Sequence, residues 1–149
     1  MTEIARTIPE CPDVIAFHRA AEPFHLFLGL REGGVEGEAR YYMDFCDKHV
    51  GNPLIRTFHG GVLASFGEVV AATYLARSLD RGDLPDCSTM TFDYLRPAFA
   101  GTICAVPHIV RAGRRITTVS VQMRLEEKLV CIGRFLFPVG GKPLGDKAL

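Results

Sequence analysis

The stretch from Phe58 to Arg77 limits most strongly what this chain can fold into. After His59 it is apolar nearly all round, and Glu68 is the one charged residue between His59 and Arg77. A helix that is apolar on every side is buried rather than lying on a surface. The sequence therefore predicts a central helix that ends near Leu79 and is covered by a curved antiparallel sheet.

Glu68 is unusual in such a helix, because a carboxylate is rarely buried without a partner. The residues three and four positions away from it are all small and leave space around the carboxylate: Ala64, Ser65, Ala71 and Ala72. Two interpretations remain open. Glu68 belongs to a functional site, or it pairs with an arginine from another strand or another subunit.

The residues before this helix favour a site. Gly60 and Gly61 follow His59 directly, and glycines let a ligand approach the backbone closely. The first amides of a helix have no partners within the helix and lie at the positive end of its dipole. A carbonyl oxygen that gains negative charge would be stabilised there.

Length and composition indicate one globular domain over residues 1–149, with a core at about 24–139, a helix at the N-terminal end and a frayed C-terminal tail. The 17 basic and 17 acidic residues give zero formal net charge, which argues against nucleic acid as a partner. No uninterrupted apolar run reaches the length of a membrane span, and the N-terminus lacks a signal-peptide core. The five cysteines contain no Cys-x-x-Cys, so we expect free thiols in a reducing cytoplasm and no metal site: Cys11, Cys46, Cys87, Cys104 and Cys131.

Alternating apolar and polar residues predict strands on both sides of the central helix. A short helix is expected between Pro12 and Pro23. The sequence Glu32-Gly33-Gly34 predicts a hairpin turn. Pro107 indicates a sheet edge or a bulge. We expect a loop over 47–57. The predicted strands cover 25–31, 35–45, 88–95, 102–111, 116–125 and 129–137.

At this point the chain resembles a known family. The order of elements, the His-Gly-Gly sequence at 59–61 and an acid nine residues after the histidine resemble the hotdog-fold acyl-CoA thioesterases of the phenylacetic-acid-pathway and hydroxybenzoyl-CoA types. Residues 94–98 followed by Gly101, and then residues 112–114, also match that family, and the resemblance covers roughly 24–139. It implies an α+β hotdog fold, in which a curved antiparallel sheet wraps around a long central helix.

The resemblance also implies roles for the residues around the helix. Glu68 would be the catalytic carboxylate, acting as base on a water or as nucleophile. The backbone N–H of Gly60, alone or with that of Gly61, would polarise the thioester carbonyl. His59 would hold the loop and orient that carbonyl. The family needs no metal or cofactor, since coenzyme A is part of the substrate, and it builds its sites between the subunits of a homodimer or of a tetramer made from two dimers.

Further residues are expected to bind the acyl-CoA substrate. Asn52 is offered in place of the family's Asn or Gln, because Pro53 occupies that position here. Ser65 stands in for the residue that orients water, since Ala72 occupies the usual place. An apolar slot for the acyl group is expected to include Phe58, and the coenzyme A phosphates are expected to contact arginines: Arg96, Arg114 and either Arg111 or Arg115.

Two alternatives remain open at this stage. A hydratase or dehydratase of the same fold would pair a helical acid with a histidine, for which His49 is the one hint. A non-catalytic acyl-CoA-binding module would need the apolar slot but no buried carboxylate, so Glu68 argues against it.

Overall fold

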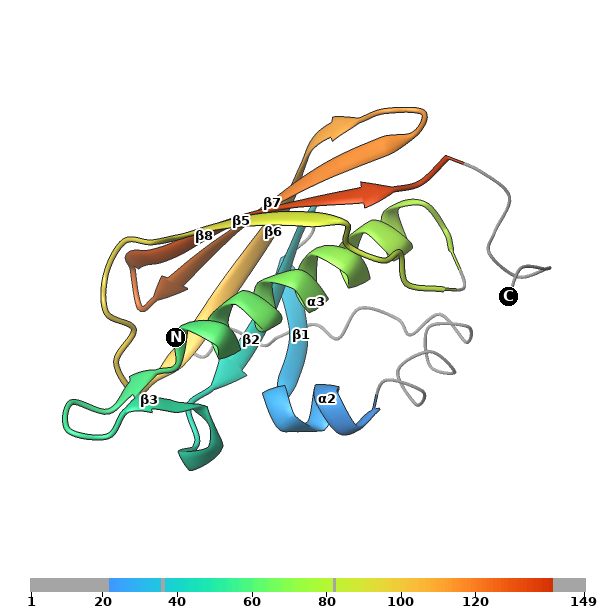
Figure 1. Cartoon of the computed structure of the whole chain (residues 1–149). Coiled ribbons are helices and arrows are strands. Elements are labelled where there is room, and N and C mark those ends of the chain that lie inside the picture. The colour runs from blue at the N-terminus through green and yellow to red at the C-terminus, as the bar shows by residue number, and fades with distance from the viewer. Residues whose placement is uncertain (1–21, 36, 82, 141–149) are drawn as a thin grey trace.

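The fold is a six-stranded antiparallel sheet that curves around one long helix (Figure 1). The computed structural model describes residues 22–35, 37–81 and 83–140, and most of the helix predicted after Pro12 lies outside these ranges. The elements in chain order are α2 (Glu22–Leu28), β1 (Leu30–Val35), β2 (Glu38–Asp44), the 3₁₀ turn η1 (Asp47–His49), β3 (Val50–Asn52), β4 (Thr57–Phe58), α3 (Gly60–Ser78), β5 (Thr89–Tyr94), β6 (Thr102–Ala112), β7 (Ile116–Leu125) and β8 (Lys128–Pro138).

The order of strands in the sheet is β1-β2-β6-β7-β8-β5, and each neighbouring pair is antiparallel. The two edges are therefore β1 and β5. The short strands β3 and β4 pair with one another in front of the N-terminus of α3. The predicted α+β class and the curved sheet around a central helix are confirmed.

Helix α3 forms where the sequence predicts it and is buried along most of its length. Phe66, Val70 and Leu75 are fully buried, and each such side chain contributes about 1.5–3 kcal/mol relative to an exposed one. At Gly67 an added Cβ would lie 2.7 Å from Met123 Cε and 2.8 Å from Phe135 Cζ. The helix therefore sits against β7 and β8 at a distance that only glycine allows. Within the described ranges, no helix is long and apolar enough to cross a membrane.

The strands after the helix follow the predicted alternation. In β7 the side chains of Thr117, Val119, Val121 and Met123 are buried and face α3, while those between them face the other side of the sheet. The predicted boundaries of this strand are reproduced, and those of β5, β6 and β8 are within one residue. Strand β6 pairs with β2 only as far as Ala105, so Pro107 lies where β6 has no neighbour on that side. The sequence-based reading of Pro107 as an edge position is confirmed.

The prediction of a strand over 25–31 is wrong. Residues 25–28 form the end of α2, and Gly29 follows in the left-handed conformation (φ 63°), so only Leu30 and Arg31 of the predicted range lie in a strand. That strand, β1, runs through the expected turn at Gly33-Gly34. A short apolar run such as His25-Leu-Phe-Leu-Gly-Leu30 does not distinguish a helix from a strand by its periodicity. The loop predicted over 47–57 contains η1 and the β3–β4 pair.

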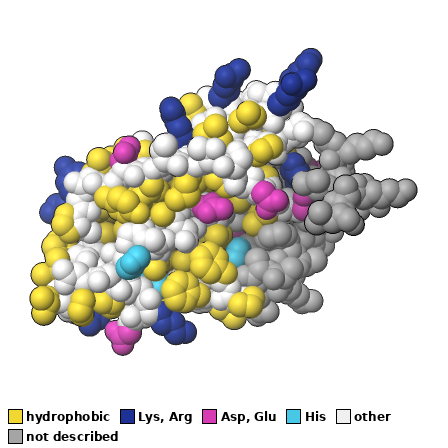
Figure 2. All heavy atoms as spheres, viewed as in Figure 1, with side chains coloured by type: hydrophobic (Ala, Val, Ile, Leu, Met, Phe, Trp, Pro, Cys, Tyr) yellow, Lys and Arg dark blue, Asp and Glu magenta, His cyan; other side chains and the backbone are white. Residues whose placement is uncertain are grey.

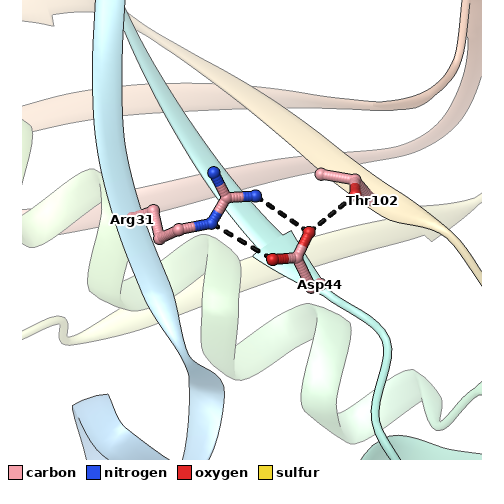
Figure 3. Close-up of polar contacts among 3 residues, drawn as sticks. All are labelled: Arg31, Asp44 and Thr102. Carbon is pink, nitrogen blue, oxygen red and sulfur yellow. Dashed lines mark hydrogen bonds and ion pairs between the residues drawn. The ribbon is translucent and has the colours of Figure 1, made fainter. Parts of the chain in front are cut away.

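Two polar clusters join the first strands to the rest. Arg31 donates two hydrogen bonds to the carboxylate of Asp44, 2.8 and 3.1 Å long, and Thr102 donates a third, so that β1, β2 and β6 are joined (Figure 3). Arg77 of α3 forms an ion pair with Glu32 of β1 in which both side chains are mostly buried. This second pair ties the C-terminal turn of the central helix to the edge of the sheet.

Candidate active site

In the first turn of α3, the backbone N–H groups differ in whether they have an acceptor among the described residues. The Gly61 N–H donates to Nδ1 of His59 at 2.9 Å, and the N–H groups of Val62 and Leu63 donate to the His59 carbonyl at 3.0 and 3.2 Å. Among the described residues, no acceptor lies within hydrogen-bonding distance of the Gly60 N–H. Gly60 therefore offers a free donor at the positive end of the helix, whereas the Gly61 donor is already used by the N-cap.

Contacts with the buried His49 hold the segment that leads into this turn. His49 is buried, its Nε2 lies 2.7 Å from the carbonyl oxygen of Phe27, and its own carbonyl accepts a 2.7 Å bond from the His59 N–H. The ring of Phe58 stacks on the imidazole of His49, and the ring of Phe45 meets Phe58 edge-on at 5.0 Å. These contacts place His59 and Gly60 at the surface while the residues just before them belong to the core.

Phe58 and Asn52 each have contacts within the chain that involve the loop before α3. Phe58 is buried among aromatic rings, so it packs the core. The side-chain oxygen of Asn52 accepts a 3.0 Å bond from the Leu54 N–H and thereby stabilises the turn after β3. Both residues were expected to bind substrate, and the structure shows them supporting the loop that leads to His59.

Glu68 lies on the partly exposed side of α3, on the same face as Ser65 and Gly61. In the part of the chain that the structure describes, it forms no ion pair and no hydrogen bond. The arginine partner that sequence analysis left open is therefore not found among these residues. Burial, together with the nearby charge of Glu68, raises the pKa of the Cys87 thiol, which places Cys87 close to this carboxylate.

Gly60 and Glu68 are separated along the helix. Glu68 follows Gly60 by eight residues, and at about 1.5 Å per residue the two positions lie about 12 Å apart along the axis. Before reaction, the atom that attacks a carbonyl carbon lies about 3–3.5 Å from that carbon. A separation of about 12 Å between the two backbone positions is long for one carbonyl group to contact both the Gly60 amide and the Glu68 carboxylate of the same chain.

Tyr94 is a residue that sequence analysis did not place in the site. Its hydroxyl donates a 2.8 Å hydrogen bond to the carbonyl oxygen of Gly60, and an added Cβ on Gly60 would lie 3.1–3.2 Å from the Tyr94 ring. The only signal in the sequence was its position at the start of the segment 94–98, which matches the family. Tyr94 thus covers the turn that carries the free amide.

The expected phosphate-binding arginines lie at opposite ends of the sheet. Arg96 donates a 2.7 Å bond to the carbonyl of Leu129, at the same end as Tyr94, whereas the carbonyl of Arg115 accepts from Val139. Ten residues of β8 and its extension separate Leu129 from Val139, which is roughly 33 Å at 3.3 Å per residue. Arg114 and Arg115 line a groove of about 450 Å³ together with Arg111, Gly113, Ile116, Thr118 and Leu136.

Two thiols among the described residues have raised pKa values. Burial raises the pKa of Cys131 to about 11, so this thiol stays protonated near neutral pH, as does Cys87 with its raised pKa. Among the described residues, no group of three His, Cys, Asp or Glu side chains is arranged to hold a metal ion.

Hydrophobic side chains gather over α3 and β5 on the face that Figure 2 shows. At the free edge of the sheet, β5 and the residue after it expose Met90, Tyr94 and Leu95 by 40%, 54% and 47%. An edge strand with exposed apolar side chains is a surface that another chain can cover.

Comparisons with known proteins agree with this architecture. The sequence profile described as the thioesterase superfamily matches residues 56–132, just over half of the chain. The chain therefore belongs to the thioesterase superfamily, which supports thioester hydrolysis as its general activity. No curated protein matches the chain.

Solved structures show the same hotdog fold. The thioesterase HI1161 of Haemophilus influenzae has 19% sequence identity and a TM-score of 0.74, with 87% of this chain and 90% of that chain covered. The PaaI protein of the E. coli phenylacetic acid degradation operon has 24% identity and a TM-score of 0.67, with 85% and 98% covered. A phenylacetic acid degradation-related protein of Ralstonia eutropha has 23% identity and a TM-score of 0.70, with 78% and 89% covered.

Proposed function

We propose that this protein hydrolyses an acyl-CoA thioester to a free acid and coenzyme A. The observation that carries the proposal is the free N–H of Gly60 at the positive end of α3. This amide would donate to the thioester oxygen as negative charge develops on it. One such donor contributes about 10²–10³-fold to the rate.

Glu68 supplies the second element of the reaction. As a base it takes a proton from water, the hydroxide oxygen bonds to the thioester carbon, and the carbon–sulfur bond breaks to release the coenzyme A thiolate. As a nucleophile its carboxylate oxygen bonds to the thioester carbon and the carbon–sulfur bond breaks, which releases the coenzyme A thiolate and leaves an acyl anhydride. Water then hydrolyses the anhydride to the free acid and the Glu68 carboxylate. A positioned base contributes about 10²–10⁴-fold. Ser65, one turn before Glu68 on the same face, is suited to orient the water.

The site forms between two copies of the chain, because Gly60 and Glu68 are about 12 Å apart within one helix. In a twofold dimer the surface that each copy offers is the same, so Gly60 of one protomer can face Glu68 of its partner. The free edge strand β5 and its exposed Met90 and Leu95 support a homodimer in which β5 pairs with its counterpart. A tetramer would be a dimer of such dimers.

The arginines differ in what they can contact in this arrangement. Arg96 lies at the Gly60 end and is the arginine best placed for the phosphates of a coenzyme A bound there. Arg114 and Arg115, at the far end of β8, would serve only a coenzyme A whose thioester is held by another protomer. The free thiols Cys46, Cys87, Cys104 and Cys131 favour a reducing compartment, and we place the reaction in the cytoplasm.

No observation favours the hydratase alternative. His49 is buried and its ring bonds the carbonyl of Phe27, so it supports the loop and does not face the space in front of Gly60.

The test is a panel of aryl and straight-chain acyl-CoAs, scored by release of free thiol. Glu68→Ala is expected to lower kcat by at least about 100-fold with the fold intact. Glu127→Ala, in the exposed turn between β7 and β8, is the matched control and is expected to keep full activity. Near-normal turnover by Glu68→Ala would reject the assignment, and formation of an enoyl thioester without thiol release would favour a hydratase.

A further inference from the structure

One peptide group at the start of α3 is held from both sides. The Tyr94 hydroxyl donates to the carbonyl oxygen of Gly60 at 2.8 Å, and the N–H of the same peptide group, which belongs to Gly61, donates to Nδ1 of His59 at 2.9 Å. Tyr94, the Gly60–Gly61 peptide and His59 therefore form a continuous chain of hydrogen bonds between β5 and the N-cap of α3.

The donors in this series of hydrogen bonds all point the same way, from Tyr94 towards His59. A donor on the peptide oxygen draws electron density from the N–H of the same peptide group, so the hydrogen bond from Tyr94 strengthens the one from Gly61 to His59. Nδ1 of His59 accepts a hydrogen bond and so carries no proton, which leaves the proton of the neutral imidazole on Nε2. His59 is exposed, so its Nε2–H is accessible to a ligand.

The Tyr94 ring also fits this turn closely. A Cβ on Gly60 would lie 3.1 Å from the ring, which is tighter than ordinary contact, so a larger residue there would require the Tyr94 ring to shift by a few tenths of an ångström. Burial raises the pKa of the Tyr94 hydroxyl. The hydroxyl therefore keeps its proton at neutral pH and acts as the donor.

We propose that Tyr94 is a positioning residue, which holds the first turn of α3 and sets His59 in the Nε2–H form, so that His59 and Gly60 present two donors to one carbonyl oxygen. This inference rests on the proposed function for Gly60 and His59. It assigns to Tyr94, the last residue of β5, a part in the site that the sequence analysis did not give it.

The test is Tyr94→Phe, with Tyr42→Phe as the matched control. Tyr42 lies on β2 under the guanidinium of Arg31, and its variant is expected to behave as wild type. Tyr94→Phe keeps the ring over Gly60 and removes only the donor. We expect kcat to fall about five- to tenfold with KM nearly unchanged, as for loss of one hydrogen bond.

The second readout needs no substrate. Nitrogen chemical shifts of His59 are expected to show an unprotonated Nδ1 and a protonated Nε2 in the wild type and in Tyr42→Phe, and a mixture of both forms in Tyr94→Phe. Unchanged shifts and unchanged kcat in Tyr94→Phe would overturn the inference. A wild type without thioesterase activity, whose His59 shifts still respond to Tyr94→Phe, would overturn the proposed function and support the positioning role.

Discussion

Proline at position 60 would remove the proposed donor while keeping the helix. Gly60 is the first residue of α3, and its N–H takes part in no hydrogen bond among the described residues. Proline is favoured at the first position of a helix, where its missing N–H has no intrahelical acceptor. His59 has the extended conformation that a residue before proline needs, with φ −66° and ψ 133°. Gly60→Pro should therefore leave the helix intact.

The matched control is Gly60→Ala. Both variants add a Cβ that would lie 3.1 Å from the Tyr94 ring, and both displace the hydroxyl, but alanine keeps the N–H. The ratio of their kcat values therefore isolates the amide. We expect Gly60→Pro to be about 10²–10³-fold slower than Gly60→Ala, which corresponds to about 2.7–4 kcal/mol of transition-state stabilisation.

The assay is thiol release from the acyl-CoA that the wild type hydrolyses best, at saturating substrate. Thermal unfolding of both variants reports whether the fold is retained, and the two should unfold at similar temperatures. If Gly60→Pro turns over substrate as fast as Gly60→Ala does, the Gly60 amide is not the oxyanion donor, and the reasoning from the free N–H fails.

Three further predictions follow from the geometry. Gly60→Pro and Glu68→Ala protomers, each inactive alone, should regain about a quarter of wild-type activity when they are mixed and exchange subunits. Half of the dimers are then mixed, and each mixed dimer has one intact site of two. A mixture as inactive as its components would place both groups in one chain. Glu32→Ala should lower the free energy of unfolding by about 3 kcal/mol, since it leaves the mostly buried guanidinium of Arg77 without its ion pair; a loss below about 1 kcal/mol in chemical denaturation would contradict this value. The pKa of Asp44 is lowered from 3.8 by its hydrogen bonds, so the stability it provides is present above that pH and is lost as the pH falls through the lower, folded-state pKa. The destabilisation by Asp44→Asn, about 0.2–1 kcal/mol at pH 7 for so exposed a group, should therefore vanish in acid; a difference that persists below pH 2 would refute the assignment.

The elements that the sequence predicted well are long ones, in which the same pattern of apolar and polar residues recurs many times. Strand β7 alternates over its whole length, and α3 is apolar on every side, so each pattern is specified many times over. The run 25–31 contains too few residues to fix a period, and the left-handed turn at Gly29 decided its structure.

The candidate site was predictable only where it depends on local spacing. The distance between Gly60 and Glu68 follows from helical rise alone. The burial of Phe58, which sequence analysis expected in the acyl slot, depends on Phe45 and His49, which approach it through tertiary packing. The contact between Tyr94 and Gly60 spans 34 residues and has no periodic signature.

The separation of Gly60 and Glu68 along one helix has a consequence for how activity would vary with the amount of protein. In the proposed dimer a newly made chain is inert until it meets a second copy, and specific activity falls when dilution separates the copies. A damaging substitution at Gly60 or Glu68 in one gene copy would also affect chains made from the other gene copy. Every dimer of one altered and one normal chain would lose one of its two active sites.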